Sequence, residues 1–90
     1  MDQIRQRITF SGRVQGVGFR YRAKYAADGC GVTGWVHNEW DGTVSMEAQG
    51  TMEQITKMLT IINQSAYIVI DDLTRGEIAL EEHEHGFHIR

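Results

Sequence analysis

The sequence has little of what disulfide-rich, membrane or secreted proteins require. A single cysteine in 90 residues, Cys30, excludes an internal disulfide framework and a zinc site built from cysteines, and favours a reducing compartment. No apolar run approaches the ~20 residues of a membrane-spanning helix. The first residues, MDQIRQRITF, lack the apolar block of a secretory signal. These absences predict a cytoplasmic protein that makes no use of a membrane.

Excess positive charge is also lacking. The formal net charge is −3, which disfavours a general nucleic-acid binder. Six of the nine lysines and arginines nevertheless lie between Arg5 and Lys24. Any attraction for an anion is therefore expected to be local, near the start of the chain.

Apolar spacing predicts a regular series of strands and helices. A period of two over residues 7–14 indicates a strand, and helical spacing from Phe19 to Cys30 indicates a helix that Gly29 ends. Residues 32–38 and 43–50 read as the strands of a hairpin. The pair Thr51 and Gln54 has the spacing of a capping box and predicts that a second helix starts there.

The rest of the chain predicts further strands. Residues 66–70, AYIVI, resemble a buried strand, and the segments 77–81 and 86–90 are weaker candidates. The order β-α-β-β-α-β with a short extra strand is typical of the ferredoxin-like α+β fold, in which both helices cover one face of a mostly antiparallel sheet. We expect residues 1–90 to form one such domain. The fold hosts many functions, so the function has to be inferred from a site.

The junction between the first strand and the first helix, SGRVQGVGFRYR, lacks the side chain that usually starts a helix. The first amides of a helix need partners, and Ser, Thr, Asp or Asn commonly supplies one. Here Gln15, Gly16, Val17 and Gly18 occupy the place of that residue. Glycines permit a conformation in which successive amides point toward an anion, and Arg20 can offer two donors to one phosphate. Local sequence leaves two readings open, an anion site and a plain tight turn.

Two common nucleotide-binding motifs are absent from this junction. The Gly-Lys-Ser/Thr ending of a P-loop is missing, and the glycine spacing differs from the dinucleotide fingerprint. ATP and NAD are therefore not expected as ligands, and no cofactor is predicted.

The nine residues GRVQGVGFR, 12–20, resemble the signature of the acylphosphatase family. The blocks GWVHN and DGTVSMEAQG between Gly34 and Gly50 resemble its second signature, and the terminal FHIR resembles the usual family ending. The resemblance spans most of the chain and implies the same ferredoxin-like fold. It implies an enzyme that hydrolyses the carboxyl-phosphate bond of acyl phosphates without metal, cofactor or covalent intermediate.

The resemblance also implies roles for particular residues. The substrate phosphate is expected to lie in a loop made of Gln15, Gly16, Val17, Gly18, Phe19 and Arg20, where Arg20 pairs with its oxygens. Asn38 is expected to hold the attacking water. On local sequence alone an asparagine at a strand end is more simply a turn residue, and the family pattern is what favours the catalytic role. The expected partners are a small acyl phosphate and inorganic phosphate, which competes with it, and the protein is expected to be monomeric, without nucleic acid or membrane partners.

This chain departs from the family pattern at two places. His37 stands where a basic or other long residue is more usual, which makes the local charge pH-dependent. The segment NQSAYIVI lacks a Gly-Pro that is common there. Neither position carries the chemistry, so both departures concern the subtype within the family rather than the reaction.

Other residues suggest weaker hypotheses. His83 and His85 share a face if they lie on a strand, and with His88 they invite a metal-site reading, but an acidic, solvated edge is the simpler interpretation. Trp35 and Trp40 flank Asn38 and offer a wall for an acyl pocket, although ordinary packing explains them equally well.

Two alternative functions stay open at this point. The motif GVGFRYR superficially resembles the glycine-aromatic-basic motif of RNA-binding modules with this fold, although here it leads into a helix. A regulatory domain that binds acetyl or carbamoyl phosphate without turnover is the other alternative. The sequence does not identify the physiological acyl group.

Overall fold

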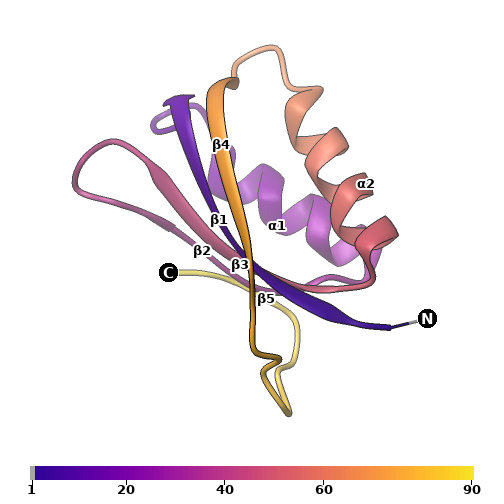
Figure 1. Ribbon diagram of the computed structural model, residues 1–90. Helices are drawn as coiled ribbons and strands as arrows, with labels where there is room; N and C mark the ends of the chain where they lie inside the picture. Colours follow the sequence, from indigo (N-terminus) through magenta and orange to yellow (C-terminus); the bar gives the residue numbers. More distant parts are fainter. Residues whose placement is uncertain (1) are drawn as a thin grey trace.

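The structure is a computed structural model that describes residues 2–90, and one five-stranded sheet with two helices accounts for most of them (Figure 1). In chain order the elements are β1 (Ile4–Arg13), α1 (Phe19–Cys30), β2 (Thr33–Asn38), β3 (Val44–Gly50), α2 (Met52–Asn63), β4 (Val69–Ile78) and β5 (Phe87–Ile89). Both helices lie on the same face of the sheet (Figure 1). This is the predicted ferredoxin-like α+β arrangement with an additional short strand.

The strand order in the sheet is β4-β1-β3-β2-β5. Every neighbouring pair is antiparallel except β2 and β5, which are parallel over Gly34 to Val36 and Phe87 to Ile89. Because β1 and β2 both pair antiparallel with β3, which lies between them, they run in the same direction and their C-terminal ends lie at the same end of the sheet. Phe10 of β1 pairs with Val44, which in turn pairs with Asn38 of β2.

The helices are formed by sequence features of two kinds. α2 has the predicted capping box: the amide of Gln54 donates to Thr51 Oγ1 (3.2 Å) and the amide of Thr51 donates to Gln54 Oε1 (2.8 Å). Its apolar stripe, Ile55, Met58 and Ile62, is fully buried. α1 instead buries small residues, the alanines 23, 26 and 27, together with Phe19, and small side chains let its backbone pack close to the sheet.

Two details of the sequence prediction are wrong. α1 continues through Gly29 to Cys30 and ends at Gly31 (φ 74°), whose amide donates to the carbonyl of Ala27. The strand expected at 66–70 starts only at Val69, continues to Ile78 and is mostly exposed. The apolar segment 66–70 suggests burial, but β4 lies at the edge of the sheet and, within residues 2–90, has only β1 beside it. Within this segment only Ile68 is buried. The candidate 77–81 contributes two residues to β4, whereas the candidate 86–90 is confirmed as β5.

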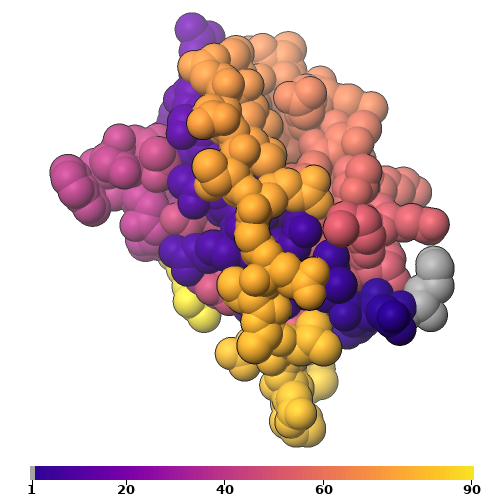
Figure 2. All heavy atoms as spheres, in the orientation of Figure 1, coloured from indigo at the N-terminus to yellow at the C-terminus, as the bar shows by residue number. Residues whose placement is uncertain are grey.

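The β4 edge is exposed along its length, and Figure 2 shows its atoms crossing the front of the molecule uncovered. Three acidic residues lie along it, Asp71, Asp72 and Glu77, all exposed. Its pairing with β1 is also irregular between Ser11 and Gly12. Charges and bulges of this kind discourage an edge strand from pairing with another chain.

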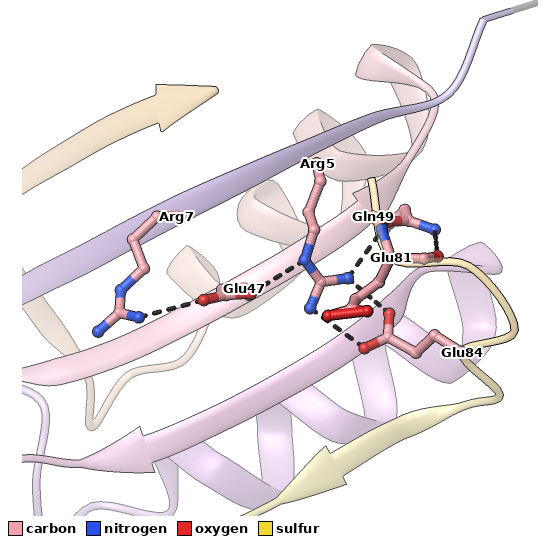
Figure 3. A network of polar contacts seen from close by, with 6 residues as sticks. All are labelled: Arg5, Arg7, Glu47, Gln49, Glu81 and Glu84. Carbon is pink, nitrogen blue, oxygen red and sulfur yellow. Dashed lines mark hydrogen bonds and ion pairs between the residues drawn. The ribbon is translucent and has the colours of Figure 1, made fainter. Parts of the chain in front are cut away.

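On the sheet face opposite the helices, Arg5 is the centre of a polar network (Figure 3). Only 2% of this arginine is exposed, and it contacts Glu47 (2.9 Å) from β3 and both carboxylate oxygens of Glu84 (2.8 and 3.1 Å) from the loop before β5. Burial disfavours the charge on Arg5, but these hydrogen bonds outweigh it and raise its pKa above the usual value. The network therefore ties the chain between β4 and β5 to the sheet.

Within residues 2–90 no helix is both long enough and apolar enough to cross a membrane.

Candidate active site

The turn from β1 into α1 presents backbone amides without a capping side chain. The residue before the helix, Gly18, is in the left-handed conformation (φ 78°), as is Gly16 (φ 73°). The first backbone bond of α1 runs from the amide of Arg22 to the carbonyl of Gly18 (3.0 Å), so the amides of residues 19–21 have no partner inside the helix. No side chain of residues 2–90 caps this terminus. This geometry favours an anion at the positive end of the helix dipole.

Arg20 lies in the first turn of α1, where a positive side chain is ordinarily unfavourable by about 0.3–1 kcal/mol. That first turn contains no acidic residue, and none of the ion pairs found within residues 2–90 involves Arg20. Arg20 is half-buried, and its guanidinium is therefore free to pair with a ligand.

Asn38 ends β2 and belongs to the same region. Its Oδ1 is buried and accepts no hydrogen bond from residues 2–90. Buried polar atoms are nearly always satisfied, so an unpaired one calls for an additional partner such as a water or a ligand. A turn residue of the usual kind would bond its own backbone instead.

A pocket of about 90 Å³ brings these groups together. Its lining residues come from the end of β1, the turn, the first turn of α1 and the end of β2: Val14, Gly16, Gly18, Phe19, Arg20, Tyr21 and Asn38. Larger hollows lie on the helix face and beside β4, but they contain neither Arg20 nor Asn38.

Most of the predicted site residues meet in this pocket. Gly16, Gly18, Phe19, Arg20 and Asn38 line it, whereas Gln15 and Val17 lie outside its lining. The side chain of Val17 packs partly against the core. That of Gln15 is turned toward the β2–β3 hairpin, where Nε2 donates to the carbonyls of Glu39 (2.7 Å) and Thr43 (2.9 Å).

Sequence reasoning missed two lining residues, Val14 and Tyr21. Val14 entered the sequence prediction only as the last residue of the strand 7–14, and its position directly before the glycine turn was the signal available. Tyr21 is 73% exposed and follows Arg20 in the chain, but one exposed tyrosine carries no distinctive pattern.

The tryptophans lie outside the pocket. Trp35 is on the opposite sheet face, between the guanidinium groups of Arg7 and Arg90, which lie 5.0 and 4.5 Å from its ring centre. Trp40 is 97% exposed in the hairpin turn. The hypothesis that they form a wall of the acyl pocket is therefore wrong for Trp35, because successive residues of a strand point to opposite faces and residues 35 and 38 differ in parity.

His83 and His85 do not lie on a strand, as the metal hypothesis required, whereas His88 lies in β5. His83 has a positive φ of 64° in the loop before β5, and His88 Nε2 lies 2.6 Å from the carbonyl oxygen of His85. Across residues 2–90, no group of three or more His, Cys, Asp or Glu side chains is placed to hold a metal ion.

Comparison with known proteins decides the family. The model of the acylphosphatase family matches residues 6–89, which is nearly the whole chain. The chain belongs to the acylphosphatase family.

Individual acylphosphatases agree with this assignment over most of their length. The acylphosphatase of Clostridium acetobutylicum is 39% identical over 83 residues, 91% of each chain. That of Lactiplantibacillus plantarum is 49% identical over a shorter stretch of 55 residues, 61% of each chain. The crystal structure of acylphosphatase from Bacillus subtilis has a TM-score of 0.88 and 35% identity, covering 97% of this chain and 98% of that one.

The same domain also occurs inside larger proteins. The crystal structure of full-length HypF in its phosphate- and nucleotide-bound form matches 99% of this chain with a TM-score of 0.86 and 26% identity, but the match covers 12% of HypF.

The family match and the individual acylphosphatases confirm the expected family, the acylphosphatase enzyme class and the ferredoxin-like fold.

Proposed function

We propose that the chain hydrolyses acyl phosphates to a carboxylate and inorganic phosphate by in-line attack of a water on the phosphoryl group. The water oxygen forms a bond to phosphorus while the bond from phosphorus to the acyl oxygen breaks. The carboxylate leaves with that electron pair, and a proton of the water passes to a phosphoryl oxygen. A carboxylate is a good leaving group, so this reaction needs little general-acid assistance.

The uncapped start of α1 holds the phosphoryl group in this proposal. The amides of residues 15–20 face its oxygens, with Gly16 and Gly18 supplying the left-handed conformations that the turn needs. Arg20 pairs with two oxygens through its planar guanidinium. Because the transition state of phosphoryl transfer spreads charge over the equatorial oxygens, fixed donors at these positions stabilise it.

The observation that carries the proposal is that Asn38, whose buried Oδ1 accepts no hydrogen bond from residues 2–90, lines the same pocket as Arg20. This oxygen can accept a hydrogen bond from a water and so orient the water's lone pair toward phosphorus. An amide does this without adding a negative charge that would repel the phosphate. Holding the water and the phosphoryl group in one geometry can account for much of the acceleration.

The test is the hydrolysis of benzoyl phosphate by the purified chain, followed by ultraviolet absorbance. We expect turnover that survives exhaustive chelation with EDTA and that inorganic phosphate or sulfate inhibits competitively. Arg20→Ala should lower kcat/KM by ~10²-fold or more, whereas Arg75→Ala, a change of the same kind on exposed β4, should not. A requirement for Mg²⁺ or Zn²⁺, or equal effects of the two substitutions, would overturn the proposed site.

A domain that binds acyl phosphates without turnover is the remaining alternative, and the same assay separates it. Such a domain would protect its ligand from hydrolysis, and phosphate would still shift the amide resonances of residues 15–20. RNA binding has less support, because the glycine-aromatic-basic motif lies in the turn and first helical turn rather than along a strand.

We also propose that the protein is a monomer in the cytoplasm. The exposed β4 edge carries Asp71, Asp72 and Glu77, which oppose pairing with a second copy. The one cysteine, Cys30, is free and half-buried, which fits a reducing compartment. Sedimentation at several protein concentrations tests the first statement.

A further inference from the structure

The side chain of Gln15 joins the two halves of the site. Gln15 lies at the start of the glycine turn, and its side chain extends to the β2–β3 hairpin, which follows Asn38. There its single Nε2 lies 2.7 Å from the carbonyl oxygen of Glu39 and 2.9 Å from that of Thr43. Both amide protons of Gln15 are thus used at once.

The two acceptor carbonyls form the base of the hairpin. The amide of Glu39 donates to the carbonyl of Thr43 (2.9 Å), and the amide of Gly42 donates to the carbonyl of Glu39 (3.3 Å). Asp41 accepts from the amide and the hydroxyl of Thr43 (3.0 and 2.7 Å), which fixes the turn. Gln15 therefore contacts a rigid structure, and Glu39 is directly bonded to Asn38 in the chain.

Chemistry sets the orientation of this amide. The two contacts are to carbonyl oxygens, which only accept hydrogen bonds, so the nitrogen of Gln15 and not its oxygen must face them. An aspartate or glutamate in its ionised form could not replace it. The contact spans 24 and 28 residues of sequence, and it closes the gap between the turn that presents the amides and the strand end that presents Asn38.

We propose that Gln15 is a positioning residue: its side chain sets the place of Asn38 relative to the phosphate-binding turn and so aligns the attacking water. This inference rests on the proposed hydrolysis. The backbone amide of Gln15 belongs to the phosphate loop, but its side chain acts on the water through the hairpin. Side-chain substitution should therefore separate the two roles, because it leaves the backbone amide in place.

The first test uses Gln15→Met, which keeps the length of the side chain and removes both donors. We expect kcat for benzoyl phosphate to fall by ~10-fold or more, since small misplacements of reacting groups are costly. The Kd for inorganic phosphate should stay within about threefold of wild type, as the loop amides and Arg20 are retained. Circular dichroism and the amide spectrum give the folded fraction, to which both values are normalised.

The second test shows whether Gln15 acts through Asn38. In a double-mutant cycle, adding Gln15→Met to Asn38→Ala should lower kcat by less than about twofold further, because the group that Gln15 positions is already gone. Full additivity of the two losses would mean that Gln15 acts by another route and would overturn the inference.

The third test uses pH. In Gln15→Glu an ionised carboxylate faces two carbonyl oxygens, whereas the protonated acid can donate one hydrogen bond. The ratio of variant to wild-type kcat should therefore rise severalfold as the pH falls from 8 to 5. Glu39, Asp41 and Arg20 are present in both proteins, so the direct effect of their charges on kcat is common to both terms of the ratio. Gln15→Met should show no such rise, and Gln3→Glu, the same change on an exposed side chain, should keep a ratio near one.

The outcomes distinguish this inference from the proposed function. Wild-type turnover with kcat of both Gln15 variants within twofold of normal would refute the positioning role alone. Equal losses in kcat and in phosphate affinity would also refute it, because Gln15 would then act on the phosphate loop. Absence of turnover in the wild-type chain would refute the proposed function and this inference with it.

Discussion

Replacing Asn38 by alanine should separate activity from stability. The buried Oδ1 has no partner among residues 2–90, and a buried unsatisfied polar group costs about 1–3 kcal/mol. Its removal should therefore leave the free energy of unfolding unchanged within about 0.5 kcal/mol, or increase it. Loss of the group that orients the water should reduce kcat by ~10²-fold, equivalent to about 2.7 kcal/mol of transition-state stabilisation.

The alternative role, a structural turn residue, predicts the opposite pattern. A lost turn contact would destabilise the chain by about 1 kcal/mol and leave kcat of the folded protein unchanged. For a domain of this size 1 kcal/mol corresponds to a change in Tm of roughly 4–8 °C, which differential scanning calorimetry resolves easily. Phosphate affinity should be nearly unaffected under either role, since Asn38 is proposed to hold the water and not the anion.

The assay combines benzoyl phosphate turnover, phosphate titration and thermal melting of wild type and Asn38→Ala. Asn63→Ala, the same change on an exposed residue at the end of α2, is the matched control and should keep normal kcat. An Asn38→Ala protein with near-normal kcat and a lowered Tm would refute the water-positioning argument. A variant that loses both kcat and phosphate affinity would place Asn38 on the phosphate instead.

Three further substitutions test the rest of the structure. Arg20→Lys should raise KM and lower kcat together in the benzoyl phosphate assay, because lysine lacks the bidentate fork; a change in KM alone would contradict a transition-state role. Glu84→Gln should destabilise the chain by about 1–3 kcal/mol at pH 7 in urea denaturation, since it leaves buried Arg5 with one carboxylate fewer. Burial opposes the charge on Glu84, but its hydrogen bonds, Arg5 first among them, hold its pKa below the usual 4.5. The stabilisation by the ionised Glu84 is therefore present above pH ~4.5 and is lost as the pH falls through the lowered pKa. The difference in stability between wild type and Glu84→Gln should shrink by pH 4, and a constant difference would refute the ion-pair explanation. Asp72→Val on the β4 edge should promote concentration-dependent association in sedimentation experiments, and a variant that stays monomeric would show that this charge does not protect the edge.

The sequence by itself determined the order and type of most elements, because these depend on neighbouring residues. The capping box at Thr51 and Gln54 defines the start of α2 through contacts three residues apart. The glycine turn before Phe19 is equally local, since the absence of a capping side chain is visible in the sequence. The resemblance to the family signature added the candidate site residues Arg20 and Asn38. Local patterns alone could not have assigned these two distant residues to one site.

Only the tertiary structure decided which distant residues meet. The strand order places the end of β2 near the turn after β1, and this brings Asn38 into a pocket with Arg20, where its Oδ1 has no partner within the described residues 2–90. The same order puts β4 at an edge, so that a strand expected to be buried is exposed. It also directs the side chain of Gln15 to the hairpin, a contact across 24 residues. Periodicity in the sequence shows which face of a helix or strand is apolar, but it does not show which elements pack side by side. The site is formed where β1, α1 and β2 meet, so it depends on that packing.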